Sequence, residues 1–359
     1  MFYGIAAAVS ALLLASVLAA LLRAAALRAG LVRQGSAGPD RRARPVPLLG
    51  GVAVVLSTGA VAVVGDRTGN APLGSVGQLL IASAAVAALG LVADVWRLRT
   101  RFLAAGTAVA AACVVPYDDI GPAAGLAAVG WIVFVALAFK GLDRADGPAG
   151  TVGVITAFGV GVCAAVEVMD GLVVLLSVLA AALTGFLLHG WPRPARIGLG
   201  ACGSLFTGFV LASAAVLTRS GYDAVSSVGV LFALTAVASA DAVLALLVVL
   251  PRRPAGRSRG RGGPDHLAHR LRRLGLTPQG VTVVLGAGAF SGVLVGVLVH
   301  AGWIGGTAVL WVAAGALVAV LALLRVPVYG APRQPDISVR PPRRAESSQV
   351  SSRLRVRSG

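Results

Sequence analysis

The sequence predicts an all-α polytopic membrane protein with about eleven transmembrane helices. Of its 359 residues, 57% are hydrophobic and only 13% are Asp, Glu, Lys or Arg, against roughly 25% charged residues in soluble domains. The mean hydropathy of +0.87 is too high for a water-soluble chain, which must cover its surface with polar groups. The apolar residues also fall into runs, and about 20 such residues are needed to cross a bilayer as a helix.

Eleven apolar runs are expected to form these helices, because an α-helix rises 1.5 Å per residue. Their approximate limits are 4–27, 48–64, 75–92, 102–115, 121–139, 150–168, 172–188, 202–217, 227–250, 280–299 and 305–324. The fourth run is short and ends at Pro116, and the sixth and seventh are separated only by Met169, Asp170 and Gly171. The first run lacks the basic residues that begin a cleaved signal peptide, so we expect it to stay as a span.

The positions of the cations predict the orientation of the chain. With the N-terminus outside, 29 of the 31 Lys and Arg residues fall on the inner side, and only Arg67 and Arg219 fall outside. Basic residues that flank spans stay on the cytoplasmic side, so we expect a multi-pass protein of the cytoplasmic membrane with its C-terminus inside. The net charge of +17 comes without a nucleic-acid motif or aromatic interleaving, so nucleic acid is not an expected partner.

The chain divides into two predicted parts. Residues 1–326 are expected to form a transmembrane helical domain, and residues 327–359, rich in Pro, Arg, Ser and Gln, a disordered basic cytoplasmic tail. The tail either contacts anionic lipid head groups or only sets the topology. Cys113, Cys163 and Cys202 are odd in number and not closely paired, so no disulfide framework or zinc site is expected.

A few ionisable residues are the candidates for function. Asp241 lies inside the ninth run, near the expected midplane, where a charge costs about 2.5–3.5 kcal/mol on insertion scales. It is either a buried acid satisfied by a neighbouring Ser, Thr or Arg, or part of a site. The other candidates lie at expected cytoplasmic helix ends or in the long inner loop, and they are Asp94, Asp143, Asp146, His266 and His269. They predict a site where a lipid head group and a charged, water-soluble substrate meet. A transporter is a minor alternative, since several mid-membrane polar groups or broken helices would be expected there.

Five segments resemble, in order, the motifs of one enzyme family. PVPLLGG at residues 45–51 matches the P-x-P-x-L-G-G start of the second span in polyprenyl-phosphate N-acetylhexosamine-1-phosphate transferases. Residues 90–102 resemble the Asp-Asp motif of this family, and residues 139–150 its N-x-x-D-G-x-D-G-x-A-G loop. Residues 196–209 resemble its R-x-x-x-G-D-x-G-S segment, and residues 264–279 its D-H-x-H-H-R-L loop. The resemblance covers about residues 40 to 280 and implies the same many-helix fold.

The resemblance implies transfer of an amino-sugar 1-phosphate from a uridine diphosphate (UDP) sugar to polyprenyl phosphate, with Mg²⁺ as cofactor and release of uridine monophosphate. The implied partners are these two substrates and membrane lipids, with a homodimer left open. Asp94, Asp143 and Asp146 would be catalytic, with Asp94 nearest the acceptor phosphate and Asp143 a base or a nucleotide anchor. The implied substrate-binding residues are Lys140, Arg196, Ser204, His266, His269 and Arg270. His266 and His269 would share a helix face if their segment is helical.

Several positions depart from the family pattern. The first of the paired aspartates is Ala93, and the metal-ligand aspartate of the G-D-x-G-S segment is Ala201. A methyl group cannot coordinate Mg²⁺, which needs near-octahedral oxygen ligands. Positions 97, 140 and 144 carry cations instead, and we expect Lys140 to attract phosphate as a point charge. Two alternatives stay open: a working transferase with altered metal dependence, or an inert relative that binds polyprenyl phosphate or a nucleotide sugar, or scaffolds a partner enzyme.

Overall fold

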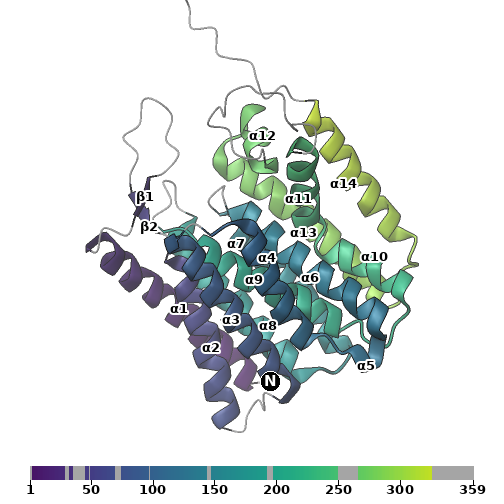
Figure 1. Ribbon diagram of the computed structural model, residues 1–359, viewed down its shortest axis with the longest axis horizontal. Helices are drawn as coiled ribbons and strands as arrows, with labels where there is room; N and C mark the ends of the chain where they lie inside the picture. Colours follow the sequence, from purple (N-terminus) through teal and green to yellow (C-terminus); the bar gives the residue numbers. More distant parts are fainter. Residues whose placement is uncertain are drawn as a thin grey trace, which may run out of the picture. The chain divides into compact units, whose positions relative to one another are not determined.

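A computed structural model of the chain (Figure 1) describes residues 2–28, 32–34, 45–47, 49–68, 74–96, 98–143, 147–191, 197–249 and 266–325. These residues belong to one unit, Met1–Val326. The predicted tail, residues 327–359, lies outside the described residues. So do Asp146 and Arg196 among the candidate site residues, and Arg97 and Arg144 among the substituted positions.

The described part of the chain is helical apart from two short strands, which confirms the predicted all-α class. The helices are α1 (Phe2–Arg28), α2 (Gly50–Arg67), α3 (Gly74–Trp96), α4 (Thr100–Val114), α5 (Tyr117–Ile120), α6 (Pro122–Leu142), α7 (Pro148–Val166), α8 (Asp170–Gly190), α9 (Gly200–Leu217), α10 (Ala224–Leu234), α11 (Ala236–Val249), α12 (Leu267–Arg273), α13 (Pro278–His300) and α14 (Ala308–Leu324). Strands β1 (Val32–Gln34) and β2 (Pro45–Pro47) pair antiparallel, with Val32 opposite Pro47.

The helices are those of a multi-pass membrane protein. Within the described residues, eight helices are long and apolar enough to cross a membrane, and α10 and α11 qualify together as one span bent by 86°. All eleven predicted runs are helical, but α4 and α14 have only 15 and 17 residues. The count of eleven crossings and the orientation therefore stay predictions.

Helix α9 is the buried centre of this bundle, and its small residues let other helices approach closely. It packs against α2, α3, α6 and α7 (Figure 1), and every residue from Gly200 to Val216 is buried. A Cβ atom on Gly51 of α2 would lie 2.2 Å from the Gly203 nitrogen, and one on Gly90 of α3 would lie 2.6 Å from the Ala201 oxygen. Such backbone contact is how helices associate where lipid removes the hydrophobic driving force.

The bundle has two ends that matter for function. We call the end where α3 and α6 finish and α9 and α12 begin the motif end, because the family-like segments gather there. It is marked by Asp94, Leu142, Gly200 and Leu267. We call the end where α9 and α13 finish and α6 and α10 begin the opposite end, marked by Leu217, His300, Pro122 and Ala224.

The ninth predicted run, residues 227–250, is not one straight helix, and this corrects the expected position of Asp241. The helix breaks at Thr235, whose backbone leaves helical geometry and whose hydroxyl donates to the Leu231 carbonyl at 2.8 Å. Side chains that satisfy freed backbone groups permit such breaks within membranes. Helical rise along a straight span predicted Asp241 near the midplane. After the 86° bend it lies beside Gly141, in the last turn of α6.

Candidate functional site

Asp94 caps the N-terminus of α9 at the motif end. Its Oδ1 accepts a hydrogen bond from the Ala201 amide at 3.0 Å, and its Oδ2 accepts one from the Cys202 amide at 3.1 Å. The first amides of a helix have no partner within the helix, and the positive end of the helix dipole favours an acid there. Asp94 therefore joins the end of α3 to the start of α9.

The glycines of the PVPLLGG motif hold the same region from another side. The Gly50 amide donates to the Gly198 carbonyl at 3.0 Å, and the Gly51 amide donates to the Leu199 carbonyl at 2.8 Å. The first amides of α2 are thus paired with the carbonyls that immediately precede α9. This backbone contact needs glycine because a Cβ atom on Gly51 would also lie 2.4 Å from the Leu199 oxygen.

Asp241 pairs with His266, one of the candidate substrate-binding residues. Oδ2 of Asp241 lies 2.8 Å from Nδ1 of His266, and Oδ1 accepts the Leu267 amide at 2.7 Å. Both side chains are buried, Asp241 being 1% and His266 9% exposed. Asp241 therefore fixes the His266 ring and also caps α12, which begins at Leu267. Asp241 is satisfied by a neighbour, but that neighbour is His266 and not the Ser, Thr or Arg that we expected. The role of Asp241 in a site stays a prediction.

The end of α6 packs against this pair. A Cβ atom on Gly141 would lie 3.0 Å from Cε1 of His266 and 3.3 Å from Oδ2 of Asp241. Lys140 and Asp143, which flank Gly141 in the sequence, are both half-buried, and each has interactions within the chain. The structure thus brings together the segments at residues 139–150 and 264–279, which are far apart in the sequence.

His266 and His269 do not share a helix face. His266 precedes the helix in an extended conformation, with φ −96° and ψ 157°, so the i, i+3 spacing does not apply. His266 is buried whereas His269 is exposed. Arg270 is 3% exposed and donates a hydrogen bond from Nη1 to the Leu323 carbonyl at the end of α14. The three residues therefore occupy different surroundings, and the imidazole of His266 is the one paired with Asp241.

Ser204 lies inside the bundle. Its hydroxyl is fully buried and donates to the Gly200 carbonyl at 2.7 Å, one turn earlier in α9. The structure therefore gives Ser204 a hydrogen bond within its own helix. The predicted substrate-binding roles of Ser204, Lys140, His269 and Arg270 stay predictions.

The described residues do not fit a Mg²⁺ ion. Ala93 and Ala201 are 8% and 7% exposed and offer only methyl groups, while both oxygens of Asp94 and of Asp241 accept protein hydrogen bonds. Within the part of the chain that the structure describes, no three His, Cys, Asp or Glu side chains are grouped so that they could hold a metal. Mg²⁺ takes several oxygen ligands in near-octahedral geometry, which this donor set does not supply.

The opposite end holds a polar network that the sequence analysis did not find. Arg219 is 4% exposed; its Nη1 donates to Nδ1 of His300 at 3.1 Å and its Nη2 to the Ser226 hydroxyl at 2.6 Å. Its guanidinium lies over the Tyr222 ring, 3.8 Å from the centroid, and the Tyr222 hydroxyl donates to Glu167 at 2.6 Å. Burial lowers the pKa of Arg219, and the hydrogen bond to Glu167 raises that of Tyr222. The one signal in the sequence for this network is that Arg219 lies outside the clusters of cations predicted on the inner side of the membrane.

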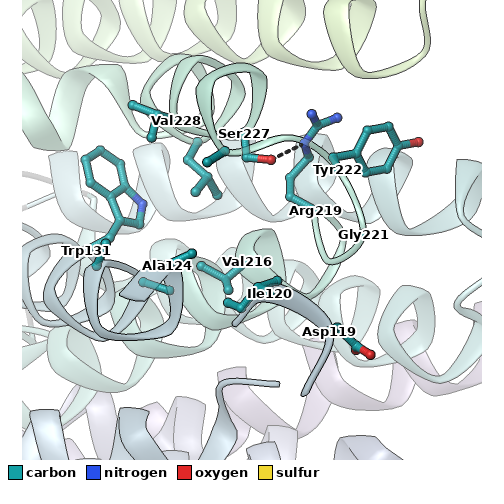
Figure 2. Close-up of a pocket in the computed structure, with 14 residues that line it drawn as sticks. Asp119, Ile120, Ala124, Trp131, Val216, Arg219, Gly221, Tyr222, Ser227 and Val228 are labelled. Carbon is teal, nitrogen blue, oxygen red and sulfur yellow. Dashed lines mark hydrogen bonds between the residues drawn. The ribbon is translucent and has the colours of Figure 1, made fainter. Parts of the chain in front are cut away.

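A pocket of about 430 Å³ adjoins this network, between α5 and α6 on one side and α10 on the other. Figure 2 shows Trp131 and Val228 at one end of the pocket and Arg219, Tyr222 and Asp119 toward the other, with Ser227 accepting from the Arg219 side chain. The remaining walls are mostly Ala, Val, Ile and Leu. None of the predicted site residues lines this pocket.

Comparison with known proteins identifies the family. A family model, glycosyl transferase family 4, matches residues 76–219. The chain is 69% identical, over 82% of its length and 71% of the relative's, to a protein of Streptomyces coelicolor named "Putative glycosyltransferase SCO3672". It is 27% identical over 68% of its length to the decaprenyl-phosphate N-acetylglucosaminephosphotransferase of Mycobacterium leprae, covering 71% of that protein. The Mycobacterium tuberculosis protein of the same name is 28% identical over 68% of this chain and 70% of its own length.

The family match covers α3 to the end of α9, which includes Asp94, the end of α6 and the start of α9. The relatives extend over about two thirds of the chain or more. Of the elements at the motif end, the family match thus includes α3, α6 and α9, whereas α2, α11 and α12 lie outside it. The chain belongs to glycosyl transferase family 4, the family of the polyprenyl-phosphate N-acetylhexosamine-1-phosphate transferases.

Proposed function

We propose that this chain transfers an amino-sugar 1-phosphate from a UDP-sugar to polyprenyl phosphate at the motif end, on the cytoplasmic face of the cytoplasmic membrane. The observation that carries the proposal is the contact of Gly141 with the Asp241–His266 pair, which joins two family-like segments at one place. Uridine monophosphate would be the second product. The product lipid would serve as an intermediate in cell-envelope glycan synthesis.

The proposed transfer has an altered metal dependence. The described donor set does not fit Mg²⁺, so no step is assigned to a metal. Lys140 supplies a positive charge beside Gly141 and would attract the phosphates of the substrates as a point charge. Asp143 would anchor the nucleotide or act as a base. Asp146 and Arg196 keep their proposed catalytic and substrate-binding roles, as do Ser204, His269 and Arg270 toward phosphate or uridine.

A second candidate function is binding without transfer. It is favoured by Asp94, which caps α9, together with Ala93 and Ala201 in place of two family carboxylates. In this case the chain would hold polyprenyl phosphate or a nucleotide sugar, or would present a surface to a partner enzyme. The scaffold would be the same, and only turnover would differ.

One assay separates the two candidates. Purified full-length protein would be given UDP-N-acetylglucosamine and polyprenyl phosphate, and release of uridine monophosphate would be followed with and without a chelator. Transfer predicts release that persists in the chelator and falls to background in Asp143→Ala. The double variant Ala93→Asp plus Ala201→Asp restores the two family carboxylates. It is therefore the matched variant for testing the candidate that binds without transfer. No release by the natural chain with several UDP-sugars, and Mg²⁺-dependent release by the double variant, would support the inert candidate.

A further inference from the structure

The Asp241–His266 pair has a consequence for the chemistry of the site, and it rests on the proposed function. We infer that Asp241 is a positioning residue that holds His266 with its proton on Nδ1, so that Nε2 accepts the proton of the polyprenyl phosphate head group. The juxtaposition that carries this inference is a buried carboxylate on Nδ1 together with a nitrogen on the other side of the ring that has no hydrogen-bond partner among the described residues. No metal is needed for this step.

The tautomer follows from the partner. An ionised carboxylate is only an acceptor, so the short contact from Oδ2 of Asp241 requires a proton on Nδ1. A neutral imidazole then has its lone pair on Nε2, which makes this nitrogen the basic one. The second oxygen of Asp241 is held by the Leu267 amide, so the carboxylate is fixed at both oxygens, and the ring cannot turn without losing its bond to Asp241.

The surroundings of Nε2 of His266 indicate a missing hydrogen-bond partner. It is buried and has no hydrogen-bond partner among the residues that the structure describes. A buried polar atom without a partner is destabilising, and such atoms are rare in folded proteins. Because Nε2 carries the lone pair, the group that would satisfy it is a hydrogen-bond donor such as an O–H.

Polyprenyl phosphate can supply this donor as an acidic O–H group. A phosphate monoester has a second pKa of about 6 and so carries a proton part of the time near neutral pH. The pyrophosphate of a UDP-sugar has no such proton in this range. The hydroxyls and the uracil N–H of a UDP-sugar are also hydrogen-bond donors, but the lipid phosphate offers the acidic proton that a neutral imidazole can take near neutral pH. We therefore assign Nε2 to the acceptor lipid.

The O–H bond of the lipid phosphate breaks and its proton moves to Nε2, which leaves a phosphate dianion and an imidazolium beside the Asp241 carboxylate. An oxygen of the dianion then forms a bond to the sugar-bearing phosphorus of the UDP-sugar. The bond from this phosphorus to the bridging oxygen breaks, and uridine monophosphate leaves with that electron pair. Among the described residues, the charged groups on the elements around His266 include Asp241 from α11, Lys140 and Asp143 at the end of α6, and Arg270 of α12, which donates to the Leu323 carbonyl of α14. The first turn of α13 has no titratable residue.

Nitrogen NMR of the imidazoles tests the tautomer directly, because the chain has only four histidines. Protein labelled with ¹⁵N-histidine would be measured in lipid, and His266→Gln would assign the signals. We expect Nδ1 of His266 to be protonated and Nε2 to be of the unprotonated type. His300 is an internal reference of opposite tautomer, because its Nδ1 accepts from Arg219. A protonated Nε2 on His266 in the natural chain would overturn the inference.

Asp241→Asn is the matched variant. Asn can still accept the Leu267 amide through its oxygen while its NH₂ group donates to Nδ1, so the fold is retained and the tautomer is reversed. We expect Nε2 to become protonated and uridine monophosphate release to fall by about 10²-fold near neutral pH, the usual size of a general-base effect. The deficit should shrink at higher pH, where the lipid phosphate is already a dianion. A deficit that does not change with pH would mean a purely structural role and would overturn the inference.

Measurements with separate ligands identify which molecule supplies the O–H donor to Nε2. They also keep this inference separate from the proposed function. Polyprenyl phosphate should shift the Nε2 signal of His266, inorganic phosphate should shift it only at much higher concentration, and a UDP-sugar alone should leave it unchanged. If polyprenyl phosphate shifts the Nε2 signal and no turnover is seen, the inference is supported and the proposed transfer is contradicted. Turnover with an Nε2 signal that ignores polyprenyl phosphate, as a buried water on Nε2 would give, would overturn the inference while the transfer stands.

Discussion

Each end of the bundle holds one buried histidine that is fixed by a charged partner. The two histidines differ in whether the second ring nitrogen has a partner among the described residues. His300, at the opposite end, accepts from Arg219 through Nδ1 and lies 3.3 Å from both the Cys163 carbonyl and Glu167 through Nε2. His266, at the motif end, is paired with Asp241 through Nδ1 and has no described partner for Nε2. A network that satisfies its own members holds helices together, whereas one that leaves a nitrogen unpaired is suited to a ligand. The burial of a histidine and the charge of its partner do not by themselves distinguish a structural network from a ligand site.

The largest expected effect concerns the backbone contact that builds the motif end. In Gly51→Ala, the new Cβ would lie 2.2 Å from the Gly203 nitrogen, so α2 and α9 must separate. Overpacking of a core usually costs about 1–3 kcal/mol and more where backbone is struck, so we expect most of the protein to be lost to aggregation. The readout is the monodisperse fraction in detergent by size-exclusion chromatography.

Gly59→Ala is the control on the same helix, because nothing lies within 4 Å of a Cβ atom there. It should behave as the natural chain or slightly better, since alanine is the better helix former. Equal losses in the two variants would show that the close approach of α2 and α9 does not hold the motif end in place.

The opposite end should respond next most strongly, and without any specific effect on substrate. Arg219→Ala leaves Nδ1 of the buried His300 and the exposed Ser226 hydroxyl without their partner. Loss of the partner of a buried polar group costs about 1–3 kcal/mol, and this applies to His300, so the unfolding midpoint in detergent should fall clearly. Arg67→Ala removes the exposed cation of the same end and should change stability by less than about 0.5 kcal/mol. Stability unchanged by Arg219→Ala would contradict a self-contained network.

Asp94→Ala should have a smaller effect on stability, and it separates capping from chemistry. The variant leaves the Ala201 and Cys202 amides at the start of α9 without acceptors. Loss of an N-cap costs about 0.5–2 kcal/mol. The measurement is thermal unfolding beside polyprenyl phosphate binding. Asp94→Asn, which keeps one acceptor oxygen, should recover part of the stability, and full stability in Asp94→Ala would rule out the capping role.

The smallest effect is a pH dependence at the opposite end. The hydrogen bond to Glu167 raises the pKa of Tyr222 above its ordinary value, so the folded state favours the neutral phenol. Its contribution to stability is therefore complete below the pKa of an unfolded tyrosine, about 10, and is lost as the pH rises through the folded value. Unfolding midpoints between pH 8 and pH 11 should fall less in Tyr222→Phe than in the natural chain. Identical slopes would place the Tyr222 hydroxyl outside the network.

The sequence predicts the helices well and the contacts between them only in part. Apolar runs locate the long helices because the bilayer imposes a minimum length, but they do not locate the short helices α5 and α12. The family-like motifs locate the motif end. The break at Thr235 has no Pro or Gly to announce it, so Asp241 was placed at the midplane instead of beside His266. Likewise, Arg219 and His300 are 81 residues apart, and no periodicity links them. Pairings between distant helices depend on packing that a single sequence does not display.

The most direct test of the account is uridine monophosphate release by the purified chain with UDP-N-acetylglucosamine, polyprenyl phosphate and excess EDTA. The account predicts release that continues in EDTA and falls by about 10²-fold in Asp241→Asn near neutral pH. Release that stops in EDTA and returns with added Mg²⁺ would contradict it, because a metal would then do the work assigned to His266 and Lys140.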